Sequence, residues 1–328
     1  MIIDNSKFII PPVLILSETS DISACRPSVA AIGFFDGVHR GHRYLIEQVR
    51  RVAAARGLAS SVVTFPVHPR KVMQPAHRPD LLTTYGEKVS LLEETGLDSC
   101  VMLDFTRELA RLSARQFMAL LKERYRIEAL VIGYDHRFGH NRSEGFDDYV
   151  RYGRELGMEV FPAQAYSYAG GGDAREAEVT VSSSVIRRLL SAGNVSEAAD
   201  YLGYGYFLEG TVVGGYQVGR KLGFPTANLR VNDPDKLVPA DGVYAVRVTV
   251  NGAEYGGMLS VGYRPTFDNG ANRSIEVHIF HFSGDIYGLP MRVSFVRFMR
   301  PEQKFDSVEA LVARIRRDEE EIKAVLSR

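Results

Sequence analysis

The stretch from Ser28 to Arg56 constrains the fold of this chain more than any other part of the sequence. Its first five residues, Ser28 to Ile32, form an apolar run typical of a strand buried on both faces of a sheet. Gly33 ends this run, and from Gly41 onward apolar residues recur with the spacing of one helix face. The sequence therefore predicts a buried strand, a glycine-rich loop and an amphipathic helix, in that order.

The loop between this strand and helix has the chemistry of an anion site. His39 and His42 lie three residues apart where the helix begins, and the first N–H groups of a helix have no partner within it. Glycines at 33, 37 and 41 allow the backbone to approach a phosphate chain, and Arg40 adds a donor. Taken singly, each histidine is better explained as a surface residue of a tight turn, so only the whole string indicates phosphate binding.

The composition restricts the class of protein. A length of 328 residues predicts two domains, and 40 basic against 40 acidic residues leave no net charge to attract nucleic acid or anionic lipid. Only Cys25 and Cys100 are present, without the spacing of a zinc site or a disulfide framework. No apolar run has membrane length. We expect a cytoplasmic protein, monomeric or weakly homo-oligomeric, with no nucleic-acid or membrane partner.

Strand and helix patterns alternate through the first half of the chain. Strands are predicted at 28–32, 60–65, 99–103 and 129–132, with helices between them, which favours an α/β fold with a parallel sheet. After the second strand, Pro66 and Pro69 predict an extended loop at the sheet edge where such folds bind ligands. In that loop His68 and Arg70 are as well explained by a structural role as by substrate contact.

Two further segments of the first half carry polar side chains. In the loop from Gly133 to Gly139, Asp135 and Arg137 could hold ribose or phosphate, or pair with each other, and Phe138 could pack on a flat ring. After three glycines at 170–172, a helix start is predicted at three serines. Capping accounts for one serine but not for all of Ser182, Ser183 and Ser184 with Arg187 one turn later.

The periodicity changes in the second half. Short runs rich in Val, Tyr, Phe and Ile predict antiparallel strands in a small β-barrel, at 206–213, 243–250, 254–261, 275–282 and 292–298. A closing helix is predicted from Ser307. The expected domains are 1–187 and 206–328, with a linker helix in 188–205.

A long glycine-rich segment separates the first two barrel strands. It is not a Walker loop, because no Gly-Lys-Ser/Thr follows, but its length indicates a functional loop. Thr226 and Asn228 offer oxygen ligands that suit Mg²⁺. Glu276, taken alone, is more often a solvated charge at a sheet edge.

The motifs of the first half resemble those of a known family. Gly33-x-Phe35-Asp36-Gly37-x-His39-x-Gly41-His42 is similar to the signature of cytidylyltransferase-like nucleotidyltransferases, and the loops at 133–139 and 182–187 resemble further motifs of bacterial FAD synthetases. The resemblance implies that His39 and His42 stabilise charge on the α-phosphate of ATP. It implies ATP contacts by Gly33, Phe35, Asp36, Gly37, Gly41, Ser182, Ser183, Ser184 and Arg187, and contacts to FMN or nucleotide by His68, Asp135, Arg137 and Phe138. Phe34 departs from the family, where Asn is usual.

The second half resembles the riboflavin kinases, whose hallmark is Gly-Phe-Pro-Thr-Ala-Asn, here residues 223–228. The resemblance implies Mg²⁺ at Thr226 and Asn228, and Glu276 as the base that takes the proton of the riboflavin hydroxyl. It implies ATP or flavin contacts by Gly215, Gly219, Arg220, Gly223, Phe224, Pro225 and Arg300, although a surface role for Arg300 is equally supported. Gly214 and Tyr216 depart from the family pattern.

Together the motifs resemble the bacterial bifunctional family that phosphorylates riboflavin and then adenylylates FMN, with ATP and Mg²⁺ in both steps. Two other hypotheses stay open. In one, only the adenylyltransferase is active and the altered barrel binds flavin without catalysis. In the other, the barrel binds nucleic acid, against which the neutral charge argues.

Overall fold

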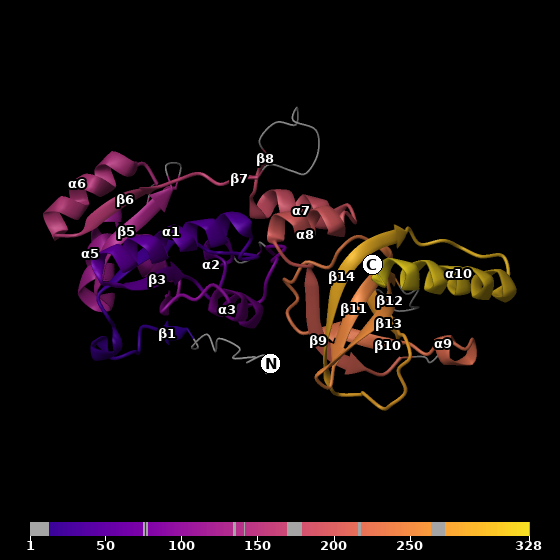
Figure 1. Ribbon diagram of the computed structural model, residues 1–328. Coiled ribbons are helices and arrows are strands. Elements are labelled where there is room, and N and C mark those ends of the chain that lie inside the picture. Colours follow the sequence, from indigo (N-terminus) through magenta and orange to yellow (C-terminus); the bar gives the residue numbers. More distant parts are fainter. Residues whose placement is uncertain are drawn as a thin grey trace, which may run out of the picture. The chain divides into compact units, whose positions relative to one another are not determined.

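The computed structural model describes residues 13–74, 76, 78–133, 136–140, 142–168, 179–215, 218–263 and 273–327. The chain divides into two compact units, residues 1–182 and 183–328 (Figure 1). The predicted residues Asp135 and Tyr216, and the glycines at 170–172, lie outside the described part. This division falls five residues before the predicted end of the first domain at Arg187.

The first unit contains a six-stranded sheet with the order β1-β4-β3-β2-β5-β6, in which every described pair is parallel. This confirms the predicted α/β class. Its strands are β1 Leu14–Leu16, β2 Ser28–Ile32, β3 Ala59–Thr64, β4 Ser99–Met102, β5 Ile127–Gly133 and β6 Glu159–Ala163, with a small pair β7 Ser167–Tyr168 and β8 Val179–Thr180. Its helices are η1 Ile22–Ala24, α1 Arg40–Arg56, α2 Pro69–Met73, α3 Tyr85–Glu93, α4 Arg107–Ala110, α5 Ala114–Tyr125 and α6 Phe146–Leu156.

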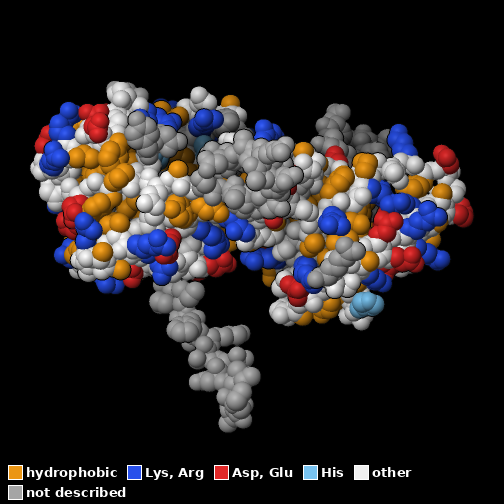
Figure 2. Space-filling model, turned by 45° about the horizontal axis from the view of Figure 1, so that its top comes forward, with side chains coloured by type: hydrophobic (Ala, Val, Ile, Leu, Met, Phe, Trp, Pro, Cys, Tyr) orange, Lys and Arg blue, Asp and Glu red, His pale blue; other side chains and the backbone are white. Residues whose placement is uncertain are grey.

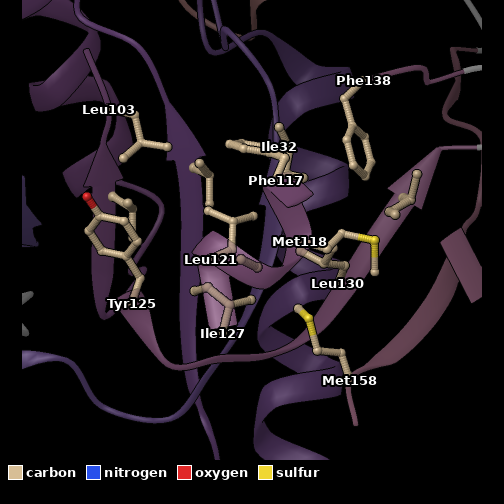
Figure 3. Close-up of a cluster of buried hydrophobic side chains, with 14 of the residues drawn as sticks. Ile32, Leu103, Phe117, Met118, Leu121, Tyr125, Ile127, Leu130, Phe138 and Met158 are labelled. Atoms are coloured by element: carbon tan, nitrogen blue, oxygen red, sulfur yellow. The ribbon is translucent and has the colours of Figure 1, made fainter. Parts of the chain in front are cut away.

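Helices cover both faces of this sheet because its central strands are apolar on both sides. Every residue of β2 and β3 is buried, although three of these eleven positions are serines and one is a threonine. Alternate residues of a strand point to opposite faces, so Ala30 and Ile32 enter the cluster beneath α5 and α6 (Figure 3). The helix α1 packs on β2 and β3. The sheet is thereby fixed as a rigid platform for the loops at its edge.

The strand order reverses at β2, which places two predicted loops side by side in the topology. From β2 the chain proceeds to β3 and β4 on one side, whereas β5 and β6 lie on the other. The carboxyl ends of parallel strands at such a reversal form the usual ligand crevice of open α/β sheets. The loops after β2 (33–39) and after β5 (133–145) both begin at this edge.

The second unit is a closed antiparallel barrel with the order β10-β13-β12-β11-β14-β9, followed by a long helix, as predicted. Its strands are β9 Phe207–Val213, β10 Ala227–Val231, β11 Gly242–Val250, β12 Ala253–Tyr263, β13 Arg273–Ile279 and β14 Pro290–Arg300. Its helices are α7 Ser183–Ser191, α8 Val195–Leu202, α9 Val218–Lys221 and α10 Val308–Leu326. Ser307 caps α10 through the N–H of Ala310, as its sequence position predicts.

Several local predictions were incomplete, and the strands β1, β6 and β10 were not among those predicted. The loop expected after β3 contains the short helix α2, because proline is well tolerated at the first position of a helix and His68 caps it. The long segment before β10 contains α9. On the face drawn in Figure 2, Lys and Arg side chains are interspersed with Asp and Glu over the described surface, in keeping with the balanced composition.

Candidate active sites

The loop after β2 has an unusual backbone. Phe35 and Val38 have φ angles of 54° and 36°, which non-glycine residues seldom adopt, and Gly37 has a φ of 81°. A Cβ at Gly41 would lie 3.3 Å from the ring of His39, so glycine lets that ring approach the helix start. Such conformations persist only where surrounding contacts fix them, and they concentrate at functional sites.

The two predicted histidines lie together at the start of α1. His39 is the N-cap residue, and its Nδ1 accepts a hydrogen bond from the backbone N–H of His42 at 3.3 Å. The two rings stack with centroids 3.6 Å apart. Burial lowers the pKa of His42 well below its usual value, and the neighbouring His39 and Lys88 lower it further. Two imidazoles so close cannot readily both be charged until an anion arrives.

Asp36 is buried and links the loop after β2 to the segment before α3. Its carboxylate is 3% exposed and accepts hydrogen bonds from the backbone N–H groups of Leu82 and Thr83, each at 3.0 Å, and from the Thr83 hydroxyl at 3.1 Å. Thr83 in turn accepts from the N–H of Gly37 at 3.1 Å. Asp36 thus joins this loop to the segment before α3, and its expected contact with ATP stays a prediction.

The segment before and within α3 contains a residue that the sequence analysis missed. Lys88 is 2% exposed, and its ammonium lies 4.1 Å from the centroid of the Phe34 ring. The predicted contact residue His68 meets the same ring edge to face at 4.7 Å. A signal was present, because Lys88 precedes Leu91 and Leu92 by three and four residues and so shares their buried helix face.

In the loop after β5, Phe138 is buried and Arg137 lies half-buried next to it. Phe138 is 8% exposed, stacks on Tyr149 with centroids 4.2 Å apart and lies within the hydrophobic cluster of Figure 3. Its ring is therefore part of the core, and the expected contact with a ligand ring stays a prediction. Arg137 lies beside it, half-buried, and its guanidinium donates to the carbonyl oxygen of His136.

The backbone at Val181, just before the three serines at 182–184, lies close to Gly41 at the start of α1. A Cβ at Gly41 would be 3.5 Å from the carbonyl oxygen of Val181, so the strand-like segment ending at Ser182 passes the start of α1. Helix α7 begins at Ser183, where the serines predicted a helix start, and carries Ser184 and Arg187. Ser182 thus follows a residue that lies at the start of α1, whereas Ser183 to Arg187 belong to the second unit, and their expected phosphate contacts stay a prediction.

In the barrel, the predicted base Glu276 and the predicted metal ligand Asn228 lie on adjoining strands, and Thr226 directly precedes β10. Asn228 on β10 pairs with Glu276 on β13, and the Thr226 hydroxyl donates to Glu276 Oε2 at 3.3 Å. A cavity of about 530 Å³ lies next to them, lined in part by Arg220, Pro225 and Thr226. Hydroxyl, amide and carboxylate oxygens in one place are the donor types that Mg²⁺ takes, together with phosphate oxygens and water.

The glycines of the same loop permit close packing. A Cβ at Gly215 would lie 2.3 Å from the amide nitrogen of Asn228, and one at Gly219 would lie 2.4 Å from the carbonyl oxygen of Phe224. Gly223 has a φ of 88°, which favours glycine. The ring of Phe224 and the carbonyl of Pro225 both contact His278, the latter at 2.8 Å from Nδ1.

Arg300 faces helix α10 rather than open solvent. Its guanidinium donates twice to the carboxylate of Asp318, at 3.0 Å from Nε and 2.7 Å from Nη2, and Asp318 is completely buried. Arg314 binds the same carboxylate at 2.8 Å. The predicted flavin contact is thus engaged in a buried ion cluster that fastens α10 to β14.

Comparisons with known proteins find one family model in each half of the chain. Residues 21–173 match the family model for FAD synthetase, and residues 202–326 match that for riboflavin kinase. The chain is 37% identical to the bifunctional riboflavin kinase/FMN adenylyltransferase of Listeria monocytogenes, over 95% of both chains. It is 35% identical to the protein of the same name from Escherichia coli K12, over 89% of this chain and 90% of the relative.

A solved structure gives the same fold under a different description. A crystal structure described as a macrolide-efflux protein from Streptococcus pneumoniae has a TM-score of 0.83 and 32% identity, covering 95% of this chain and 99% of its own. Among the described residues of our chain, no helix is long and apolar enough to cross a membrane. The full-length similarity to named flavin enzymes and both family models agree with the motifs. The chain therefore belongs to the bifunctional riboflavin kinase/FMN adenylyltransferase family.

Proposed function

We propose that the two activities of this family are carried out at two separate sites, one in each compact unit. The observation that carries the proposal is that each unit has its own arrangement suited to a triphosphate. In the first unit this is the His39–His42 pair at the start of α1, and in the second it is Thr226 beside Glu276. The barrel would phosphorylate riboflavin, and the first unit would adenylylate the resulting FMN.

In the first unit, the phosphate of FMN would attack the α-phosphorus of ATP, and pyrophosphate would leave. The attacking group is already a nucleophile, so the site has to align it and stabilise charge rather than form a covalent intermediate. The N–H groups at the start of α1 and the imidazoles of His39 and His42 would receive the developing charge. Ser182, the last residue of the first unit, would contact the outer phosphates.

In the barrel, the 5′-hydroxyl of riboflavin would attack the γ-phosphorus of ATP. Glu276 would accept the proton of that hydroxyl, and its contact with the Thr226 hydroxyl orients the carboxylate. Thr226 and Asn228 would hold Mg²⁺, which neutralises phosphate charge when bound. The cavity beside Pro225 would accept one of the two substrates.

We place the enzyme in the cytoplasm, with ATP, riboflavin and FMN as its ligands and Mg²⁺ required in both steps. Both of its cysteines, Cys25 and Cys100, are buried and free, which suits a reducing compartment. We infer a monomer or a weak homo-oligomer without nucleic-acid or membrane partners.

The decisive experiment separates riboflavin, FMN and FAD by chromatography after incubation with Mg-ATP. His42→Ala should lower FAD formation from FMN by about 100-fold or more, because transition-state charge loses a donor, while FMN formation persists. Glu276→Gln should lower FMN formation by about 100-fold or more, because the base is lost, while added FMN is still converted to FAD.

Two matched variants control for the loss of a side chain alone. His140 is exposed, and Glu254 is paired with Arg247 at the barrel surface, so His140→Ala and Glu254→Gln should leave both activities intact. Equal loss of both activities from either site variant, in folded protein, would contradict the proposal of two independent sites.

A further inference from the structure

Lys88 in α3 is a buried ammonium that the two proposed reactions leave unexplained. Lysine is almost never fully buried unless it is paired, because removing its charge from water is costly. Here the ammonium has three oxygen neighbours: the carbonyl of Phe65 at 2.6 Å, the carbonyl of Phe34 at 3.3 Å and the hydroxyl of Thr64 at 3.5 Å. These three oxygens offset part of the free-energy cost of burying the charge, and the position of the ammonium needs an explanation.

The oxygens bound by Lys88 lie at the carboxyl ends of the two central strands. Phe34 follows β2 and Phe65 follows β3, and the Thr64 hydroxyl donates to the same Phe34 carbonyl at 3.0 Å. Carbonyls beyond the end of a strand have no ladder partner, and an ammonium carries three donors that can satisfy several of them. Lys88 thus ties together the ends of β2 and β3 at the edge where the sheet binds ligands.

The residues that Lys88 binds are connected through Phe35 to His42. Phe34 precedes Phe35, which has the left-handed backbone, and the Phe35 ring packs edge to face on His42 at 5.2 Å. On its other side the loop is held by Asp36 at Thr83, five residues before Lys88. The segment 82–88 therefore holds the loop at 33–39 in two places. Its backbone N–H groups bind the buried carboxylate of Asp36, and the ammonium of Lys88 binds the carbonyl of Phe34.

We propose that Lys88 is a positioning residue for adenylyl transfer, which holds the loop at 33–39 in the conformation that presents His39, His42 and the start of α1 to the triphosphate. This inference depends on the proposed function of that loop. Lys88 acts through the carbonyls of Phe34 and Phe65 and does not itself touch the nucleotide. Its buried charge also adds to the positive potential that an anion meets, and the same potential lowers the pKa of His42.

The test is Lys88→Met, which keeps the length of the side chain and removes the charge and all three donors. Because a displacement of about 1 Å can cost about 100-fold in rate, we expect kcat for FAD formation from FMN to fall by about 30- to 100-fold. The KM for FMN should change by less than about threefold. FMN formation from riboflavin in the same molecules should stay at the wild-type rate and so reports on the folding of the second unit and on concentration, while circular dichroism and denaturant unfolding report on the first unit.

Lys122→Met is the matched control. The Lys122 ammonium also binds a backbone carbonyl, that of Gly157 at 2.7 Å, and an acidic side chain, but it lies at the remote end of α5. It should retain full adenylyl transfer. Lys88→Gln, which keeps amide donors without charge, should recover part of the lost kcat, and it decides the question if Lys88→Met gives an unfolded first unit.

The outcomes separate this inference from the proposed function. Adenylyl transfer within about twofold of wild type in folded Lys88→Met protein, or in Lys88→Gln protein where Lys88→Met does not fold, with His42→Ala inactive, would overturn the positioning role alone. Full adenylyl transfer in His42→Ala would instead overturn the proposed site. A loss in Lys88→Met that follows only the unfolded fraction, and disappears on cooling, would show a purely structural role and also overturn the inference.

Discussion

The two loops proposed to bind triphosphate are supported by different means. In the first unit, the loop at 33–39 contains non-glycine residues with positive φ and is held by buried charges, Asp36 on one side and Lys88 on the other. In the barrel, the segment at 215–228 is held by close packing, because side-chain and backbone atoms occupy the space where Cβ atoms of Gly215 and Gly219 would be.

The difference shows that similar ligand chemistry does not require similar support. Buried polar groups fix a loop through directed hydrogen bonds, so removing one donor or acceptor should disturb it. Close packing against glycine fixes a loop through excluded volume, so adding one methyl group should disturb it. The two units should therefore respond to opposite kinds of substitution.

The largest effect is expected where the barrel uses a buried charge away from its loop. Asp318→Asn leaves the guanidinium groups of Arg300 and Arg314 without their carboxylate, which should lower the free energy of unfolding of the second unit by about 3 kcal/mol. Because this cluster fastens α10 and not the segment 215–228, kcat of the kinase measured on folded protein should not change.

Denaturant unfolding and kinase assays at low temperature check this prediction. Glu254→Gln, which removes an exposed ion pair with Arg247, is the control and should cost less than about 1 kcal/mol. A rise in the KM for riboflavin, without loss of stability, would show that Arg300 contacts flavin as the family resemblance implied, and the contrast between the two units would be weakened.

A smaller effect is expected from adding one methyl group in the barrel loop. In Gly215→Ala the new Cβ would lie 2.3 Å from the Asn228 amide, so either that side chain or the loop must move. We expect FMN formation to fall by about 100-fold while conversion of FMN to FAD is unchanged. Steady-state kinetics of both reactions would measure this.

The neighbouring glycine provides the control for that variant. A Cβ at Gly214 would meet no atom within 4 Å, so Gly214→Ala should keep wild-type kinase activity. If the two variants behave alike, close packing is not what holds this loop.

The contrast between the loops also explains what the sequence could predict. Strand and helix periodicity gave the parallel sheet and the barrel, since both rest on apolar patterning, and glycine strings located both loops. The role of the segment 82–88 could not be predicted from the sequence, because it depends on contacts with residues 34, 36 and 65, which are distant in the chain. Short elements such as α2 and α9 were missed for the related reason that few residues carry too little periodicity.

The direction in which a motif side chain points was the second feature that the sequence did not predict. Asp36, Phe138 and Arg300 stand within motifs, but the fold turns them toward Thr83, Tyr149 and Asp318. A motif identifies which residues are present together, and it does not say which of them face the ligand and which hold the others in place. His39 and His42, in contrast, lie together because a helix start fixes their spacing.

The smallest expected effect concerns pH and applies to the first unit alone. Burial and two neighbouring bases keep the pKa of His42 well below its usual value of 6.5. At a pH between the lowered pKa of native His42 and 6.5, the unfolded chain binds a proton that the native site does not bind. The stability of the first unit should therefore fall as pH decreases below about 6.5, with a slope of up to about 1.4 kcal/mol per pH unit.

Hydrogen exchange of the β2 and β3 amides at pH 7.5 and 5.5, corrected for the intrinsic rate, checks this expectation. His42→Gln has no such proton to bind, so it should lose about 1 kcal/mol less than the wild type over this interval, whereas the exposed His140→Gln should behave as the wild type. Parallel pH dependence in all three proteins would mean that His42 has the same pKa in the native and the unfolded chain. The native site would then bind the proton as readily as the unfolded chain does, and a stacked pair kept neutral by burial could not be what distinguishes this site from the carboxylate-based site of the barrel.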